Sequence, residues 1–101
     1  MSNHFINFKE LHRQVMPYLP AILRRLLPDG RREGHEYVCR NPRRMDKHFG
    51  SFKVNLLTGK WSDFAIGVSG GDAASLVAYV LGITQSEAAA WLLTTIGRAA
   101  P

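Results

Sequence analysis

The residue types that perform catalysis or bind metals are few in this chain and lie far apart. Its single cysteine, Cys39, belongs to no nucleophile motif, and the four histidines stand at the separate positions 4, 12, 35 and 48. Asp63 is a candidate catalytic carboxylate, but no second acid or base lies near it in the sequence to share a proton transfer. Residues 67–71 are glycine-rich and precede a helix, yet they lack the Lys-Ser/Thr pair of a P-loop, so we expect a hinge there. The sequence therefore predicts no self-contained active site.

Basic residues are grouped in a way that suits phosphate contact better. The predicted nucleic-acid surface consists of Arg40, Arg43, Arg44, Lys47, Lys53, Lys60 and Trp61. Guanidinium groups bind phosphate in a bidentate manner, and an exposed aromatic ring stacks on an unpaired base. Trp61 has two interpretations, a stacking ring or a core indole, and the core interpretation is favoured. Phe49, which precedes a glycine outside the strands, is the alternative stacking residue.

Charge is distributed unevenly along the 101 residues. Residues 1–60 hold 12 of the 13 Lys and Arg and five of the eight acids, a net charge of +7, whereas residues 61–101 carry a net charge of −2. A basic half of this kind attracts phosphate. Arg24, Arg25, Arg31 and Arg32 have a competing local role, because cations also stabilise the negative end of a helix dipole.

The bulk composition indicates one soluble domain. Hydrophobic residues make up 46% and charged residues 21%, no apolar run reaches the roughly 18–20 residues of a membrane span, and the N-terminus does not resemble a signal peptide. One cysteine excludes an internal disulfide and fits a reducing compartment. We expect a cytoplasmic protein with no membrane partner.

Three alternating segments predict a small antiparallel sheet, at residues 36–40, 51–56 and 61–65. In the second segment Phe52, Val54 and Leu56 point inward and the residues between them point outward. Packing of Tyr37, Phe52, Trp61 and Phe64 would stabilise this sheet. The sequence thus predicts an α+β fold in which a three-stranded sheet is flanked by N-terminal helices and a C-terminal helix pair.

Capping residues and breakers predict the helices on both sides. Asn7 begins a first helix with Glu10 three residues on, while Pro17 and Pro20 interrupt it and restart a second helix that stops at Pro28-Asp29-Gly30. Asp72 caps a third helix that ends at Gly82. Residues 84–87 form a capping box for a fourth helix, with Gly97 as its stop. We divide the compact unit into an N-terminal helical segment, 1–33, and a segment 34–101.

The order of these parts resembles a known family. The motifs Gly70-Gly71-Asp72, Ser75-Leu76-Val77, Glu87-Ala88 and Trp91-Leu92 follow the strand pair, and the whole set is similar to the zinc-ribbon domain that opens bacterial and phage DNA primases. The resemblance covers about residues 34–96 and implies a zinc-ribbon-like fold that contacts a single-stranded template. It implies further that polymerisation is performed by a different domain.

The resemblance also implies metal positions that this chain has lost. Cys39 stands where the first family cysteine would be, and Pro42 replaces the histidine three residues on. The second cysteine pair would fall between Ser62 and Gly67, where neither cysteine is present. Recruitment of His35, His48 and Asp63 beside Cys39 matches no standard zinc spacing, so we expect no zinc and no other cofactor.

These observations predict a non-catalytic domain or accessory protein that binds single-stranded DNA for a primase, helicase or polymerase of a phage, plasmid or other mobile element. The alternative is a protein-interaction adaptor that docks on a replication partner and meets acidic protein with its basic face. A third hypothesis is a structural remnant of a primase gene.

Overall fold

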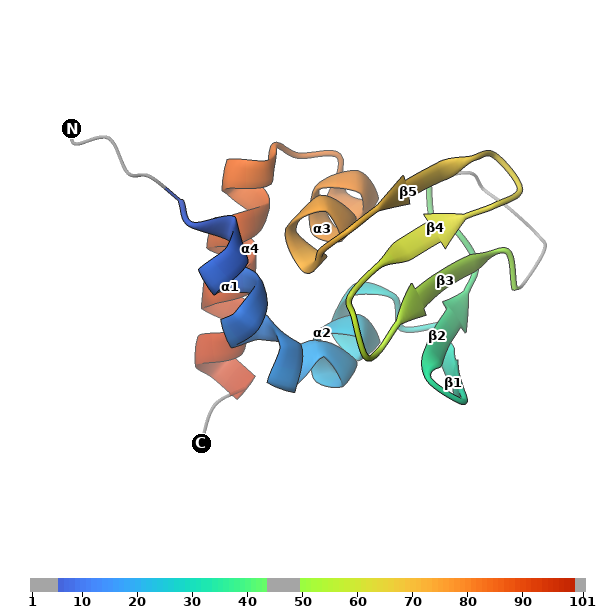
Figure 1. The fold of residues 1–101 in the computed structure, drawn as a ribbon, viewed down its shortest axis with the longest axis horizontal. Helices are drawn as coiled ribbons and strands as arrows, with labels where there is room; N and C mark the ends of the chain where they lie inside the picture. The colour runs from blue at the N-terminus through green and yellow to red at the C-terminus, as the bar shows by residue number, and fades with distance from the viewer. Residues whose placement is uncertain (1–5, 44–49, 100–101) are drawn as a thin grey trace.

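The computed structural model describes residues 6–43 and 50–99 of the chain. It has an α+β architecture in which helices lie at both ends of the sequence and a sheet lies between them (Figure 1). The elements are α1 Phe8–Val15, the 3₁₀ turn η1 Met16–Tyr18, α2 Leu19–Leu26, β1 Arg31–Glu33, β2 Glu36–Cys39, β3 Phe52–Asn55, β4 Trp61–Asp63, β5 Val68–Gly70, α3 Ala73–Leu81 and α4 Gln85–Ala99.

The sheet has five antiparallel strands in the order β1-β2-β3-β4-β5, so the prediction of three strands was wrong. The three predicted strands are present as β2, β3 and β4, and one strand was missed at each edge. β1 lies within residues 1–33, the segment expected to be helical, and all three of its residues are exposed, so it has no alternating apolar pattern. β5 is a Val-Ser-Gly strand inside the expected glycine hinge.

At Gly70, the last residue of β5, the chain passes very close to an aromatic ring. A Cβ on Gly70 would overlap the indole of Trp61, its cross-strand partner. Only glycine allows this approach. The glycine-rich segment is therefore a strand packed against tryptophan, and not a hinge.

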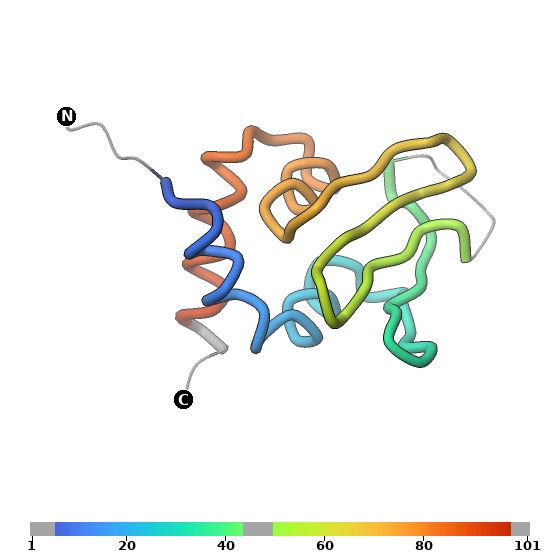
Figure 2. Tube along the Cα trace, in the orientation of Figure 1, coloured from blue at the N-terminus to red at the C-terminus, as the bar shows by residue number. Residues whose placement is uncertain are grey.

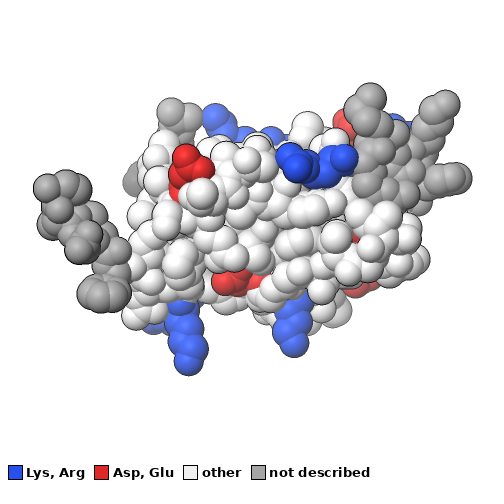
Figure 3. All heavy atoms as spheres, turned by 90° about the horizontal axis from the view of Figure 1, so that it is seen from above, with Lys and Arg blue, Asp and Glu red and all other residues white. Residues whose placement is uncertain are grey.

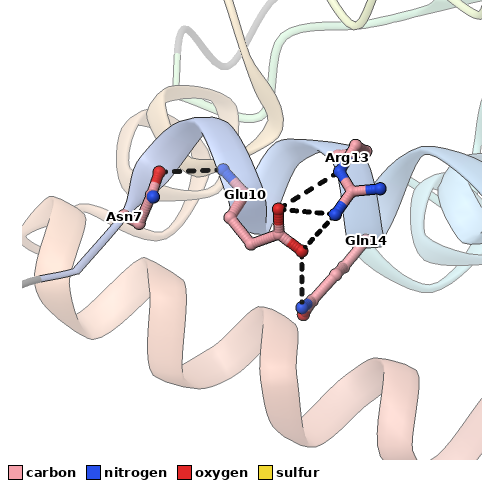
Figure 4. Close-up of polar contacts among 4 residues, drawn as sticks. All are labelled: Asn7, Glu10, Arg13 and Gln14. Atoms are coloured by element: carbon pink, nitrogen blue, oxygen red, sulfur yellow. Dashed lines mark hydrogen bonds and ion pairs between the residues drawn. The ribbon is translucent and has the colours of Figure 1, made fainter.

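Helix α1 begins as its sequence predicts. The side-chain oxygen of Asn7 accepts a 3.0 Å hydrogen bond from the backbone amide of Glu10, as Figure 4 shows. The Glu10 carboxylate does not return to Asn7 but lies against Arg13 and Gln14 further along the helix. These contacts, with the Arg13 hydrogen bond first, lower the pKa of Glu10 below its usual value.

The two C-terminal helices also have the predicted caps. Asp72 Oδ1 accepts from the amide of Ser75 at 2.8 Å, and Gly82 ends α3 with φ 68°, a conformation that favours glycine. Thr84 and Glu87 form the reciprocal capping box, with bonds of 2.9 and 3.0 Å. Gly97 does not stop α4, which continues to Ala99.

The core lies between the sheet and the inner helices α2 and α3, while α1 and α4 pack on the far side of those helices (Figure 1). The described chain begins and ends on that helical side, away from the sheet (Figure 2). Trp61 lies 5.9 Å from Phe52 and 5.2 Å from Tyr79 of α3, measured between ring centroids. Of the C-terminal helix pair, α3 packs on the sheet through Tyr79, and α4 packs against α1, α2 and α3.

Candidate nucleic-acid interface

The strand register separates two faces of the sheet. Tyr37, Val54 and Trp61 are paired across β2, β3 and β4 on the buried face. The opposite side, which we call the outer face, carries a row that crosses all five strands: Arg31, Val38, Lys53, Ser62 and Ser69. Because side chains alternate along a strand, the polar residues of this row project away from the core.

A hollow of about 360 Å³ opens on the outer face around β3, β4 and β5. Two of the predicted lysines line it, Lys53 from β3 and Lys60 from the turn that follows β3. The full lining is Glu36, Lys53, Asn55, Lys60, Trp61, Ser62, Ser69 and Gly70. Lys60 is held in place because its carbonyl accepts from the amide of Asn55 at 2.7 Å. The hollow combines two ammonium groups with hydroxyl and amide groups that donate hydrogen bonds.

An exposed aromatic ring lies beside this hollow. Phe64 is 68% exposed, and the Nζ atom of Lys53 lies 5.8 Å from the centre of its ring. Phe64 begins the turn between β4 and β5, and its amide donates to the carbonyl of Ser51 at 3.3 Å. The expectation that Phe64 packs in the core was wrong, because alternation places it with Ser62 on the outer face.

Trp61 has the opposite environment from Phe64. It is 5% exposed, and its indole N–H donates to the hydroxyl of Ser75 on α3 at 2.9 Å. The core interpretation is thus confirmed, and the ring is not presented for stacking. The alternation of β4 was the signal that distinguishes the two aromatic residues.

The predicted arginines do not all join the lysines. Arg40 is exposed directly after β2. Arg43 instead places its guanidinium against Gly82, at the C-terminal end of α3, where a cation stabilises the helix dipole. Arg44 and Lys47, and the alternative stacking residue Phe49, lie outside the described residues.

A buried polar network anchors the segment that follows β2, and the sequence reasoning missed it. The Asn41 side-chain amide donates to Asp63 Oδ2 at 2.9 Å and to the hydroxyl of Tyr79 at 2.8 Å. Asp63 Oδ1 accepts from the amide of Ala65 at 3.0 Å, and Asn41 Oδ1 accepts from that of Arg43 at 2.9 Å. Asn41 and Asp63 are 1% and 0% exposed, so the Asp63 carboxylate is buried and hydrogen-bonded within the fold.

The thiol of Cys39 lies close to this network. Burial, followed by the charges of Asp29 and Asp63, raises the pKa of Cys39 to about 12, so the thiol is protonated at neutral pH. A cysteine binds zinc as the thiolate. Within residues 6–43 and 50–99, no group of three or more His, Cys, Asp or Glu side chains is placed to hold a metal ion.

On the face drawn in Figure 3, the described Lys and Arg side chains stand apart from one another on a largely uncharged surface. Among the described helices, no single one is long and apolar enough to cross a membrane; α3 and α4 together have sufficient length and composition, but they bend by 106°.

Comparisons with protein-family models, curated proteins and solved structures find no match for this chain.

Proposed function

We propose that this protein is a non-catalytic single-stranded DNA-binding domain or accessory protein of a primase or helicase replication system, acting in the cytoplasm for a phage, plasmid or mobile element. The observation that carries the proposal is the pairing of the exposed Phe64 ring with Lys53 beside the hollow that also contains Lys60. A stacking platform next to a cationic groove is the arrangement by which proteins bind single strands without reading sequence.

Each group has a separate role in this mechanism. The ammonium groups of Lys53 and Lys60 contact successive phosphates and supply most of the affinity. The Phe64 ring stacks on a base, which any base allows because each has a π-face. Ser62, Ser69 and Asn55 offer hydrogen bonds along the groove. The proposed domain therefore prefers unpaired strands and discriminates weakly between base compositions.

The buried network supports a primase-type origin for this domain. In the family that the sequence resembles, a metal would join the segment around Cys39 to the segment after Ser62. Here Asn41 and Asp63 join the same two segments by a hydrogen bond of 2.9 Å between buried side chains. We propose that this bond and the aromatic core replace the metal as the element that stabilises a small domain.

The direct test is fluorescence anisotropy of a labelled single-stranded oligonucleotide, titrated with the protein at two salt concentrations. The proposal expects binding that weakens as salt rises, with similar affinity for strands of different composition and weaker binding to the matching duplex. Absence of single-strand binding at low salt would contradict it.

A protein-interaction adaptor is the second candidate, and one observation favours it. The turn between β4 and β5 exposes Ile66 as well as Phe64, at 47% and 68%, so it presents an apolar surface that a replication partner could cover. The adaptor predicts no single-strand binding near physiological salt. The Phe64→Ala variant would then lose the partner and show no DNA phenotype, which separates the two candidates.

A further inference from the structure

A second basic hollow lies at the other edge of the sheet. It has a volume of about 190 Å³ and lies where α2, β1 and β2 meet, and its lining consists of Pro20, Arg24, Gly30, Arg31, Arg32, Tyr37 and Leu56. Three of these seven residues are arginines, and no acid is among the described residues that line it. A volume this large exceeds the roughly 10–15 Å³ that one water needs, so the hollow has room for a larger polar group.

The arginines come from two different elements. Arg24 lies in the last turn of α2, whereas Arg31 and Arg32 are consecutive in β1 and point to opposite sides of the sheet edge. The Nε of Arg32 donates to the carbonyl of Gly34 at 3.0 Å, which fixes the direction of this guanidinium. Arg31 is 2.9 Å from Glu33, so part of its charge is balanced.

Two carbonyls at the end of α2 already have hydrogen-bond donors. The carbonyl of Leu27, just after α2, accepts from the amide of Gly30 at 3.1 Å and from the hydroxyl of Tyr37 at 2.7 Å. The carbonyl of Leu23 accepts from the amide of Leu27 at 2.7 Å. Backbone amides and Tyr37 bond these two carbonyls, so Arg24 is not needed as their donor.

Glycine shapes the floor of the hollow. A Cβ on Gly30 would overlap the Tyr37 ring, so glycine lets this ring pack directly against the backbone in the lining of the hollow. Guanidinium groups bind phosphate in a bidentate manner, and Arg24 and Arg32 line this hollow from two different elements. We propose that the hollow lined by Arg24, Arg31 and Arg32 is a phosphate-binding site, separate from the groove on the outer face.

The test titrates the purified full chain with inorganic phosphate at constant ionic strength and follows the arginine Nε–Hε signals by NMR. The signals of Arg24 and Arg32 are expected to shift saturably. Arg24→Gln and Arg32→Gln should each weaken phosphate binding by about tenfold, the size of one charge-assisted hydrogen bond. Arg24 makes no hydrogen bond within the described residues, so its variant should keep the wild-type melting temperature.

Arg25→Gln is the matched control, because Arg25 is exposed on the same helix turn and does not line the hollow. It should change phosphate affinity by less than about twofold, as expected for a long-range surface charge. Shifts that do not saturate, or an equal loss of affinity in Arg25→Gln, would overturn the proposal.

Oligonucleotide arms identify the source of the phosphate. If Arg24→Gln weakens the binding of strands with a 5′-hydroxyl and of strands with a 5′-phosphate alike, the site holds a backbone phosphodiester. If it weakens the binding of the 5′-phosphorylated strand alone, the site holds a terminal phosphate. If it weakens the binding of inorganic phosphate alone, the site binds a small phosphate compound. All three outcomes support the site, and binding of inorganic phosphate is measured independently of the groove of Lys53 and Lys60.

Discussion

The side-chain amide of Asn41 donates a hydrogen bond to the carboxylate of Asp63 across 22 residues of sequence, and both side chains are almost completely buried. One residue follows β2 and the other ends β4. This bond therefore ties the segment after β2, which carries Arg40 and Arg43, to the centre of the sheet. Tyr79 extends the tie to α3 through a 2.8 Å bond with the same amide.

Asn41→Ala should lower the free energy of unfolding by about 1–3 kcal/mol, because it removes the hydrogen bonds from Asn41 to the buried Asp63 carboxylate and to the partly buried Tyr79 hydroxyl. Urea denaturation followed by circular dichroism measures the change. Asn55→Ala is the control, since the Asn55 oxygen accepts from Leu57 and Thr58 in an exposed turn where water can replace it. A smaller loss in Asn41→Ala than in Asn55→Ala would refute a stabilising role for the network.

Trp61→Ala should cost about 3–5 kcal/mol, the typical cost of removing a large core aromatic side chain. Trp61→Phe keeps most of the packing against Phe52 and Tyr79 but loses the bond to Ser75, and should cost less. Thermal melts provide the comparison. If Trp61→Ala melted like the wild type and lost only DNA affinity, the core assignment of this residue would be wrong.

Helix boundaries could be predicted from the sequence because their signals are local. Asn7, Asp72 and Gly82 each act on residues within one turn, and each lies where its chemistry requires. The edge strands could not be predicted in this way. β1 consists of Arg-Arg-Glu and forms only because β2 offers it a partner, so the information lies in the tertiary contact.

The parts of the site that depend on local signals could likewise be predicted from the sequence, and the parts that depend on tertiary contacts could not. Lys53 and Lys60 flank one predicted turn, so their proximity follows from a local hairpin. The Asn41–Asp63 bond and the hollow between α2 and β1 depend on segments that meet only in the folded chain. The exposure of Phe64 could have been predicted, since the alternation applied to residues 51–56 would have placed its side chain on the outer face if extended to residues 61–65.

Alkaline pH should destabilise the protein through Cys39. Its pKa is raised by burial from 9.0 to about 12, so the contribution to stability is complete below pH 9 and is lost as pH rises towards 12. Tyr37 acts in the same direction, since burial raises its pKa above 10.0. The free energy of unfolding, measured from pH 7 to 11, should begin to fall above about pH 9.

Reaction of Cys39 with a thiol reagent at pH 8 provides a second readout, because only the thiolate reacts. The native protein should react slowly and the urea-unfolded protein quickly. Equal rates in the two states would show that the thiol is neither buried nor perturbed. In Cys39→Ser the alkaline loss of stability should be smaller than in the wild type.

Phe64→Ala should weaken single-strand binding by roughly 5- to 150-fold, the range for losing one stacked base, and should leave the melting temperature nearly unchanged because the ring is exposed. Phe64→Tyr, which keeps an aromatic ring, should bind like the wild type. Leu93→Ala is the control for an exposed apolar residue elsewhere, since Leu93 is 51% exposed on α4. If Phe64→Leu bound as tightly as the wild type, stacking would not be the contribution.

The lysines of the outer face give a prediction about salt. Each phosphate contact with a single strand contributes about −0.7 to the slope of log affinity against log salt concentration. Lys60→Gln should therefore reduce the steepness of the slope by about 0.7. The matched change Lys9→Gln, at an exposed lysine of α1, should not alter the slope. Lys53→Gln should have a smaller effect, because Glu36 lies 3.7 Å from its ammonium group and already balances part of the charge.

The same ion pair makes Glu36 the most discriminating position. Glu36 lines the hollow and repels phosphate, so Glu36→Gln should increase single-strand affinity by up to about fivefold, the upper range for an exposed ion pair. Anisotropy titrations of the wild type, Glu36→Gln and the control Glu33→Gln at β1 measure this. Because Glu33 lies at the far edge of the sheet, beside Arg31, its removal should leave the affinity for the outer-face groove almost unchanged. Weaker binding in Glu36→Gln, or an equal gain in both variants, would show that the strand does not cross β3 and β4.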